Sequence, residues 1–134
     1  MVSVRLCTEL LIETEDRVGL LAEASRLLGD MGISLLSVVV RRHDETASLR
    51  LVTTSQTHAA EALRAAGFCV EERDVLLMEI PHHPGFLSRM GEALARKGIA
   101  INELYATVPD DASSGLVVLR CSDNRNALLL LRGR

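Results

Sequence analysis

Two glycine turns carry the residues of this sequence whose types and spacing best suit ligand chemistry. The first is Asp16-Arg17-Val18-Gly19-Leu20, and the second is His83-Pro84-Gly85-Phe86. Each turn follows an alternating apolar run and opens an amphipathic segment, which predicts a strand-to-helix turn. A glycine there lets the backbone come close to a ligand, and the start of a helix favours an anion. Both turns are therefore candidate binding sites for a small molecule that bears a carboxylate.

The two turns belong to an internal repeat. Gly19 and Gly85 are 66 residues apart, and the same offset separates Gly32 from Gly98 and Gly67 from Gly133. Self-similarity at a fixed spacing indicates two copies of one supersecondary unit. Because units of about 65 residues are marginally stable alone, we expect the two halves to share a sheet or a core.

Side chains at the turns also have purely structural interpretations. In the structural interpretation, Gly19 has no contact with a ligand and only allows the helix to pack closely on the sheet. Asp16 is well placed as a helix N-cap, because its carboxylate can accept hydrogen bonds from the free amides of the first turn. Arg17 is either a solvated loop charge or a bidentate partner for a carboxylate. Pro84 restricts the second turn and preorganises it.

The other reactive side chains do not form a recognisable active site. His82 and His83 are adjacent in an extended segment, so they point to opposite sides and cannot easily share one metal ion. The cysteines have no adjacent histidine, and the loop carboxylates lack the apolar surroundings that raise a carboxyl pKa. We expect no enzyme activity, no metal site and no cofactor. The cysteines and carboxylates considered are Cys7, Cys69, Cys121, Glu13, Glu15, Asp16, Asp110 and Asp111.

Composition narrows the class of protein. Hydrophobic residues make up 48% and charged residues 25%, as in ordinary globular proteins. A net charge of −3 and an aromatic content of 2% argue against a nucleic-acid partner. The longest apolar run, Ala127–Leu131, is far shorter than the ~20 residues of a membrane helix, and the first residues do not resemble a signal peptide. Three cysteines without CxxC spacing suit a reducing compartment, so the cytoplasm is expected.

Hydrophobic periodicity predicts the elements that position the first turn. Period-two alternation indicates strands, and apolar residues spaced three and four apart indicate helices. The resulting order, βαββαβ, is the split-βαβ arrangement of the ferredoxin-like α+β fold. The expected elements are strands over residues 4–12, 33–42, 47–54 and 68–73 and helices over residues 20–31 and 59–66.

The second half repeats this pattern up to its last helix. Strands are expected over residues 75–80, 99–108 and 116–121, and helices over residues 86–94 and 126–132. Antiparallel sheets with helices on one face are predicted for two domains, 1–73 and 74–134. No residues follow Arg134 to form the sixth element of the second half, so this half is predicted to lack its last strand.

The absent strand would leave the strand over residues 75–80 with an open edge, and open edges invite pairing with another chain. The run Leu128–Leu131 is also apolar for a solvated helix face. Both features favour a homodimer. The plain alternative is that the sequence is truncated.

The two turns resemble the pattern of the ACT domain family. In that family D-R-P-G-x-L precedes a helix and G-I-N-I opens the next strand. Here the counterparts are Asp16–Leu21 with Gly32–Leu35, and His83–Leu87 with Gly98–Asn102. The resemblance covers the whole chain as two tandem units, similar to the small stand-alone tandem ACT proteins.

The resemblance implies regulatory binding of a free amino acid at an interface between ACT domains. The implied contact residues come from the two turns and from the strand that follows each helix: Asp16, Arg17, Val18, Gly19, Leu20, Ser34, His83, Pro84, Gly85, Phe86 and Asn102. Three positions depart from the family pattern. Val18 replaces the preferred proline, and Ser34 and Ala100 replace the asparagine that commonly contacts ligand. Asn102 is expected on the strand face of Ala100, where it could substitute.

The sequence thus predicts a non-catalytic, allosteric regulatory protein that binds an amino acid and acts on a partner such as a regulated enzyme. Two alternatives remain. One is a protein–protein interaction module without a ligand, working through the open edge of residues 75–80. The other is a small enzyme of ferredoxin-like fold.

Overall fold

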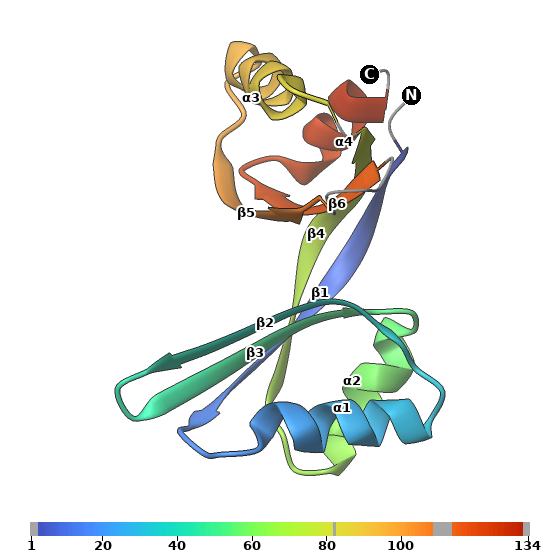
Figure 1. The fold of residues 1–134 in the computed structure, drawn as a ribbon, viewed down its shortest axis with the longest axis vertical. Coiled ribbons are helices and arrows are strands. Elements are labelled where there is room, and N and C mark those ends of the chain that lie inside the picture. The colour runs from blue at the N-terminus through green and yellow to red at the C-terminus, as the bar shows by residue number, and fades with distance from the viewer. Residues whose placement is uncertain (1–2, 82, 109–113, 133–134) are drawn as a thin grey trace. The chain divides into compact units, whose positions relative to one another are not determined.

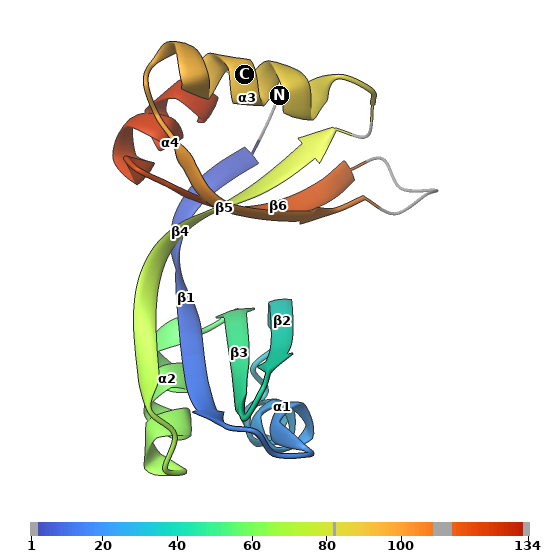
Figure 2. The ribbon, with the colours of Figure 1, turned by 90° about the vertical axis from the view of Figure 1, so that its left-hand side faces the viewer.

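The computed structural model describes residues 3–81, 83–108 and 114–132. Its strands follow the order β2-β3-β1-β4-β6-β5. The chain divides into two compact units: the first unit is Thr8–Arg73, and the second unit is Met1–Cys7 together with Asp74–Arg134. Each unit is an antiparallel sheet with two helices on one face (Figures 1 and 2). The predicted ferredoxin-like α+β fold is confirmed.

The first unit follows the predicted βαββαβ order. Strand β3 is the centre of its antiparallel ladder, pairing with β1 on one side and with β2 on the other. The elements are β1 (Ser3–Glu15), α1 (Leu20–Asp30), β2 (Leu35–His43), β3 (Thr46–Thr53), α2 (Gln56–Ala65) and the first residues of β4 (Val70–Pro81).

Alternation along the strands builds the core of the first unit. Leu10 and Ile12 of β1 and Leu49 and Leu51 of β3 are fully buried beneath the helices. The helices contribute residues spaced three and four apart, as the sequence pattern predicted: Leu20, Ala24 and Leu28 from α1, and Ala59, Ala60 and Leu63 from α2.

The second unit repeats the arrangement with α3 (Phe86–Arg96), β5 (Ile101–Thr107), β6 (Ser114–Cys121) and α4 (Asn124–Arg132). Strand β6 pairs with β4 and with β5. Its separate core is formed by side chains of β4, β6, α3 and α4, including Leu76, Met78, Leu94, Leu119 and Leu131. Asp110 and Asp111 of the β5–β6 connection, and His82, lie outside the described residues.

Strands β1 and β4 each contribute to both units. The expectation that the two halves share a sheet is confirmed, but the sequence did not predict which strands they share. The expected strands 68–73 and 75–80 form one continuous strand, β4. Residues 1–7 were assigned to the first domain, yet they group with Asp74–Arg134. In the strand order β4 lies between β1 and β6, and Val4 packs against the core of the second unit. The expected open edge of residues 75–80 is therefore wrong, because β4 has a neighbouring strand on each side, β1 and β6.

Within the described residues, no helix is both long and apolar enough to cross a membrane.

Candidate functional site

The first turn places a glycine directly before α1. Gly19 has φ of 91°, in the left-handed region that favours glycine, and α1 begins at Leu20, whose side chain is buried. In this described part of the chain, no side chain caps α1. Val18 is fully exposed beside it. The amides of the first turn of α1 therefore face the loop without a side-chain acceptor.

Asp16 is not the helix cap that the sequence predicted. Its carboxylate accepts hydrogen bonds from Nε of Arg42 at 2.8 Å and from Nη2 at 2.5 Å. Its backbone N–H donates to the carbonyl oxygen of Glu45 at 2.7 Å. Asp16 therefore ties the turn to the β2–β3 hairpin, because the bidentate geometry of arginine fits a carboxylate better than the amides at a glycine cap do.

Arg42 sets the ionisation of this carboxyl. Its hydrogen bonds to Asp16 are the largest influence and lower the carboxyl pKa below the usual 3.8; desolvation opposes this, and the charge of Arg42 adds to the lowering. A depressed pKa in the folded state means that the pair stabilises the fold at pH values above 3.8. This contribution is lost as the pH falls through the lower, folded-state pKa.

Replacing Arg42 with Gln is expected to raise the pKa of Asp16 back towards 3.8 and to remove this acid-side loss of stability. An NMR titration of the Asp16 carboxyl carbon measures the pKa directly. Arg41→Gln is the matched control, because Arg41 makes no ion pair with Asp16 in the described chain. An Asp16 pKa that is the same in the Arg42 variant and in the original protein would contradict the assignment.

Arg17 is held by its own unit. Its guanidinium donates to Glu23 of α1 at 2.5 Å and lies 5.1 Å from the centre of the Phe68 ring. These side chains and Gly67 line a hollow of about 160 Å³. Ligand pockets usually measure about 300–1,000 Å³. The first turn alone therefore offers only part of a pocket, so a whole amino acid there needs a second surface.

Ser34 lies just before β2 and is not among the residues that line this hollow. Its backbone N–H donates to Oγ1 of Thr54 at 3.1 Å, and its carbonyl accepts from the Thr54 N–H at 3.0 Å. Ala100 makes the same pair of bonds with Ser122, at 2.9 Å each. The repeat at these positions therefore conserves a backbone connection between strands, whether the residue is serine or alanine.

The second turn has the same backbone and different side chains. Gly85 has φ of 89° and precedes α3, again without a side-chain cap. The exposed His83 meets the Phe86 ring edge to face, with ring centres 6.0 Å apart. Its Nδ1 lies 3.2 Å from the Pro84 carbonyl oxygen and 3.4 Å from Nη2 of Arg89. The predicted residues His83 to Phe86 thus lie together, with Arg89 as an additional cation.

Asn102 does not follow simple alternation. Ile101 pairs with Cys121 and Glu103 pairs with Arg120, so two positions of β5 oppose one step of β6. Asn102 is the extra residue of this irregularity, and a bulge redirects the side chain it carries. The strand is therefore irregular at Asn102, and its expected role as a substitute for Ala100 stays a prediction.

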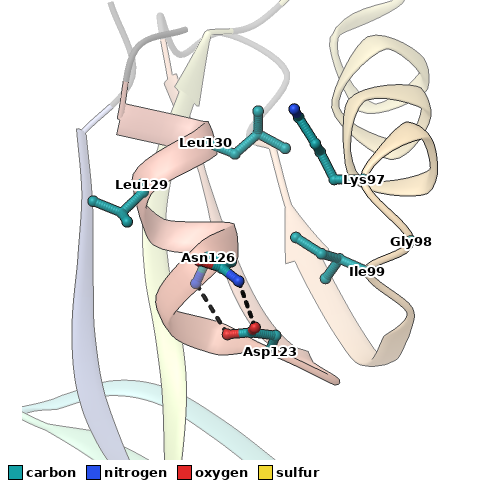
Figure 3. A pocket seen from close by; sticks show the side chains of 7 residues that line it. All are labelled: Lys97, Gly98, Ile99, Asp123, Asn126, Leu129 and Leu130. Carbon is teal, nitrogen blue, oxygen red and sulfur yellow. Dashed lines mark hydrogen bonds between the residues drawn. The ribbon is translucent and has the colours of Figure 1, made fainter.

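Two other hollows are larger than the one at Arg17. One, of about 460 Å³, is on the first unit and is lined by β1, β2 and β3 residues that include Glu13, Arg41 and Ser48. The other, of about 540 Å³, lies beside α4 and is lined by Lys97, Ile99 and Leu130 among others (Figure 3). There Asp123 accepts from the Asn126 backbone N–H at 3.1 Å and from Nδ2 at 2.7 Å, so this carboxylate closes the first turn of α4.

Two observations concern the metal-ligating and nucleophilic side chains of the described chain. Within residues 3–81, 83–108 and 114–132, no three His, Cys, Asp or Glu side chains are grouped to hold a metal ion. Burial, with a smaller effect from Asp123, raises the pKa of the Cys121 thiol. A raised pKa keeps the thiol protonated and poorly nucleophilic.

Sequence reasoning missed the partners of the first turn. Arg42, Glu23 and Phe68 fix the positions of Asp16 and Arg17. Only Glu23 had a usable signal, because an acidic residue in the first turn of a helix can face a basic residue in the preceding loop. Arg42 and Phe68 reach the turn through tertiary packing.

The family model described as ACT domain matches residues 8–67. This segment lies within the first unit, Thr8–Arg73, and is an ACT domain, which confirms the resemblance seen in its sequence. No curated protein matches the chain.

Solved structures of similar fold span nearly the whole chain. A protein from Bacteroides thetaiotaomicron is 24% identical with a TM-score of 0.87, covering 97% of this chain and 89% of its own. The ligand-free regulatory subunit of aspartate kinase from Thermus thermophilus is 18% identical with a TM-score of 0.70, covering 98% and 95%. The corresponding subunit from Thermus flavus is 18% identical with a TM-score of 0.61, covering 98% and 95%. At these identities the likeness shows the fold.

Proposed function

We propose that this chain, in which residues 8–67 form an ACT domain, is a non-catalytic regulatory protein that binds a free amino acid at its glycine turns. The observation that carries the proposal is the pair of helix starts at Gly19 and Gly85. Both glycines have a backbone in the left-handed conformation, and no described side chain caps either helix. Residues 74–134, completed by the first seven residues, serve as a second ACT domain in this proposal.

The chemistry of the turns suits the carboxylate of an amino acid. The first amides of α1 and α3 have no partner within their own helix, and the helix dipole adds partial positive charge at the same place. Arg89 adds a full positive charge beside the second turn, within 3.4 Å of His83. Arg17 is already paired with Glu23, so at the first turn the amides are the principal donors.

A homodimer completes the binding site in this proposal. The hollow at Arg17 is about 160 Å³, smaller than an amino acid with its contacts requires. The matching turn or strand of a partner copy would supply the acceptors for the ammonium group. A ligand held between two chains stabilises the paired state by its differential affinity, which is how a protein without a catalytic site passes on a signal.

The partner that receives this signal is, in our proposal, a cytoplasmic enzyme of amino-acid metabolism. The fold it shares with regulatory subunits of aspartate kinase supports this choice of partner class.

Gly19→Val is expected to weaken amino-acid binding at the first turn by roughly tenfold or more. A β-branched residue is strained at φ of 91°, so the start of α1 must shift. Its first backbone N–H groups then no longer point toward the ligand carboxylate. Isothermal titration with each of the twenty amino acids, at one fixed concentration of dimer, gives the affinities. Gly85→Val makes the same test at the second turn.

Gly29→Ala is the matched control for these variants. Gly29 lies inside α1, has no positive φ, and has open space where a Cβ would be. Alanine there should leave binding unchanged and raise helix stability by up to about 1 kcal/mol. Absence of heat with all twenty amino acids, for the original protein at millimolar concentration, would overturn the proposed function.

A further inference from the structure

The sheet of the first unit carries an ordered polar row on the face that points away from its helices. In the β1–β3 ladder Glu13 is opposite Ser48, and in the β2–β3 ladder Arg41 is opposite the same serine. In the adjacent row, Ile12 and Leu49 point into the core beneath the helices. Because side chains alternate along strands, Glu13, Ser48 and Arg41 share the helix-free face.

These three residues line the hollow of about 460 Å³. Two rows further toward the hairpin, and so on the same face, Thr46 is opposite His43, and both also line the hollow. Glu13 and Arg41 are exposed and Ser48 is half-buried between them. The hollow therefore has the negative carboxylate of Glu13 on one side, the positive guanidinium of Arg41 on the other, and hydroxyl groups between them.

The Glu13 carboxylate and the Arg41 guanidinium form no ion pair with each other in the described chain. Neighbouring strands lie about 4.8 Å apart, so the backbones of β1 and β2, with β3 between them, are separated by roughly 10 Å. No hydrogen bond or ion pair joins Glu13 or Arg41 to another side chain in the described chain. Elsewhere on the same sheet, Glu9 and Arg50 lie on adjacent strands and do pair, at 3.1 Å.

We propose that this row, the Glu13–Ser48–Arg41 row, is a second binding site, for the zwitterionic backbone of a free α-amino acid. The ligand carboxylate binds the Arg41 guanidinium and accepts a hydrogen bond from the Ser48 hydroxyl. The ligand ammonium donates to the Glu13 carboxylate. The side chain of the ligand extends over Thr46 and His43. The site is a neighbour of the hollow at Arg17, which Glu13 also lines, and it does not depend on a partner copy.

The repeat supplies a built-in comparison. In the second unit the equivalent row runs from Glu79 through Leu116 to Thr107. It keeps the carboxylate and lacks both the guanidinium and the central hydroxyl. A zwitterion therefore finds both of its charges matched on the first unit only.

The test is an NMR titration of the isotopically labelled protein with each of the twenty free amino acids. The backbone amide signals of Arg41 and Ser48 are expected to shift with one or more of them. For the amino acid that binds best, Glu13→Gln and Arg41→Gln should each weaken binding by roughly tenfold, because each removes a charge-assisted hydrogen bond. Glu79→Gln should leave the affinity unchanged.

Two derivatives of that amino acid test whether the site binds both its carboxylate and its ammonium group. Its methyl ester lacks the carboxylate charge and its N-acetyl form lacks the ammonium, so each is expected to bind roughly tenfold more weakly. Equal binding of the derivatives, or affinity that is unchanged in both Glu13→Gln and Arg41→Gln, would overturn the proposal.

The same spectra separate this site from the turn. Shifts at Leu20 and Leu21 without shifts at Arg41 and Ser48 would overturn the row site and leave the turn site standing. Shifts at Arg41 and Ser48 alone would support the row site and remove the turn site at Gly19. The absence of shifts both at Leu20 and Leu21 and at Arg41 and Ser48 would overturn both proposals.

Discussion

Removal of residues 1–7 is expected to lower the free energy of unfolding of the second unit by about 2 kcal/mol. The deleted segment includes Val4, which packs on the core of that unit, and partial loss of a valine side chain with its strand pairing is of this order. The edge of β4 would also be opened to pairing with other chains, so self-association should rise with concentration.

Amide hydrogen exchange measures this effect locally. Protection of residues 76–80 in β4 should fall, while protection of residues 49–52 in β3 of the first unit should stay the same. Val4→Ala is the companion variant, since it removes packing and keeps the strand, and its effect should be smaller than that of the deletion. Unchanged exchange at residues 76–80 after the deletion would show that residues 1–7 do not complete the second unit.

Arg50→Met is expected to destabilise the protein by about 3 kcal/mol, the largest effect of any single substitution considered. The Glu9 side chain is 0% exposed and that of Arg50 is 13% exposed. Nε and Nη2 of Arg50 donate to the two carboxylate oxygens at 3.1 Å and 3.3 Å. Methionine keeps much of the volume but takes both hydrogen bonds away from a buried carboxylate. Urea unfolding measures the change.

The chain contains a matched control for this pair. Arg120 and Glu103 form an ion pair across β5 and β6 whose side chains are 31% and 27% exposed. Because water screens this pair, Arg120→Met should cost no more than about 1 kcal/mol. The double variant Glu9→Leu with Arg50→Met should recover most of the loss, since it leaves no buried charge behind. Equal costs for the two arginine variants would contradict the role given to burial.

The elements of this fold follow from its sequence because each apolar pattern has one buried face to satisfy. The alternation of Leu10 and Ile12 and the helical spacing of Leu20, Ala24 and Leu28 each place the same residues in the core that the pattern predicted. Because the sequence repeats, the elements predicted for the first half were also predicted for the second half. Local pattern was sufficient for these core positions, because spacing along a single strand or helix decides which of its faces is buried.

Prediction failed where the chain departs from its own repeat. No glycine, proline or asparagine interrupts β4 before its last residue, Pro81, so the sequence contains no turn signal there. Two separate strands were nevertheless predicted, because the repeat suggested two equal halves. The pairing of residues 1–7 with β4 depends on contacts far apart in sequence, which no local pattern reports.

The site was predictable in its backbone and less so in its side chains. Both glycines adopt the positive φ that a turn before a helix requires. The partners of Asp16 and Arg17 could not be read from neighbouring positions, because Arg42 and Phe68 reach the turn only after the sheet has formed. The register of three strands likewise creates the Glu13–Ser48–Arg41 row, which spacing along the sequence does not reveal.

The sharing of β1 between the two units has a consequence for synthesis on the ribosome. Thr8–Arg73 contains every strand and helix of the first unit, so this unit can fold as soon as it has left the exit tunnel. Residues 3–7 are made before their partner strand, which emerges roughly 70 residues later, so their pairing is a slow, long-range step. During translation residues 3–7 therefore stay without their partner strand while the first unit is already complete, and this is the stage at which a chaperone would bind them.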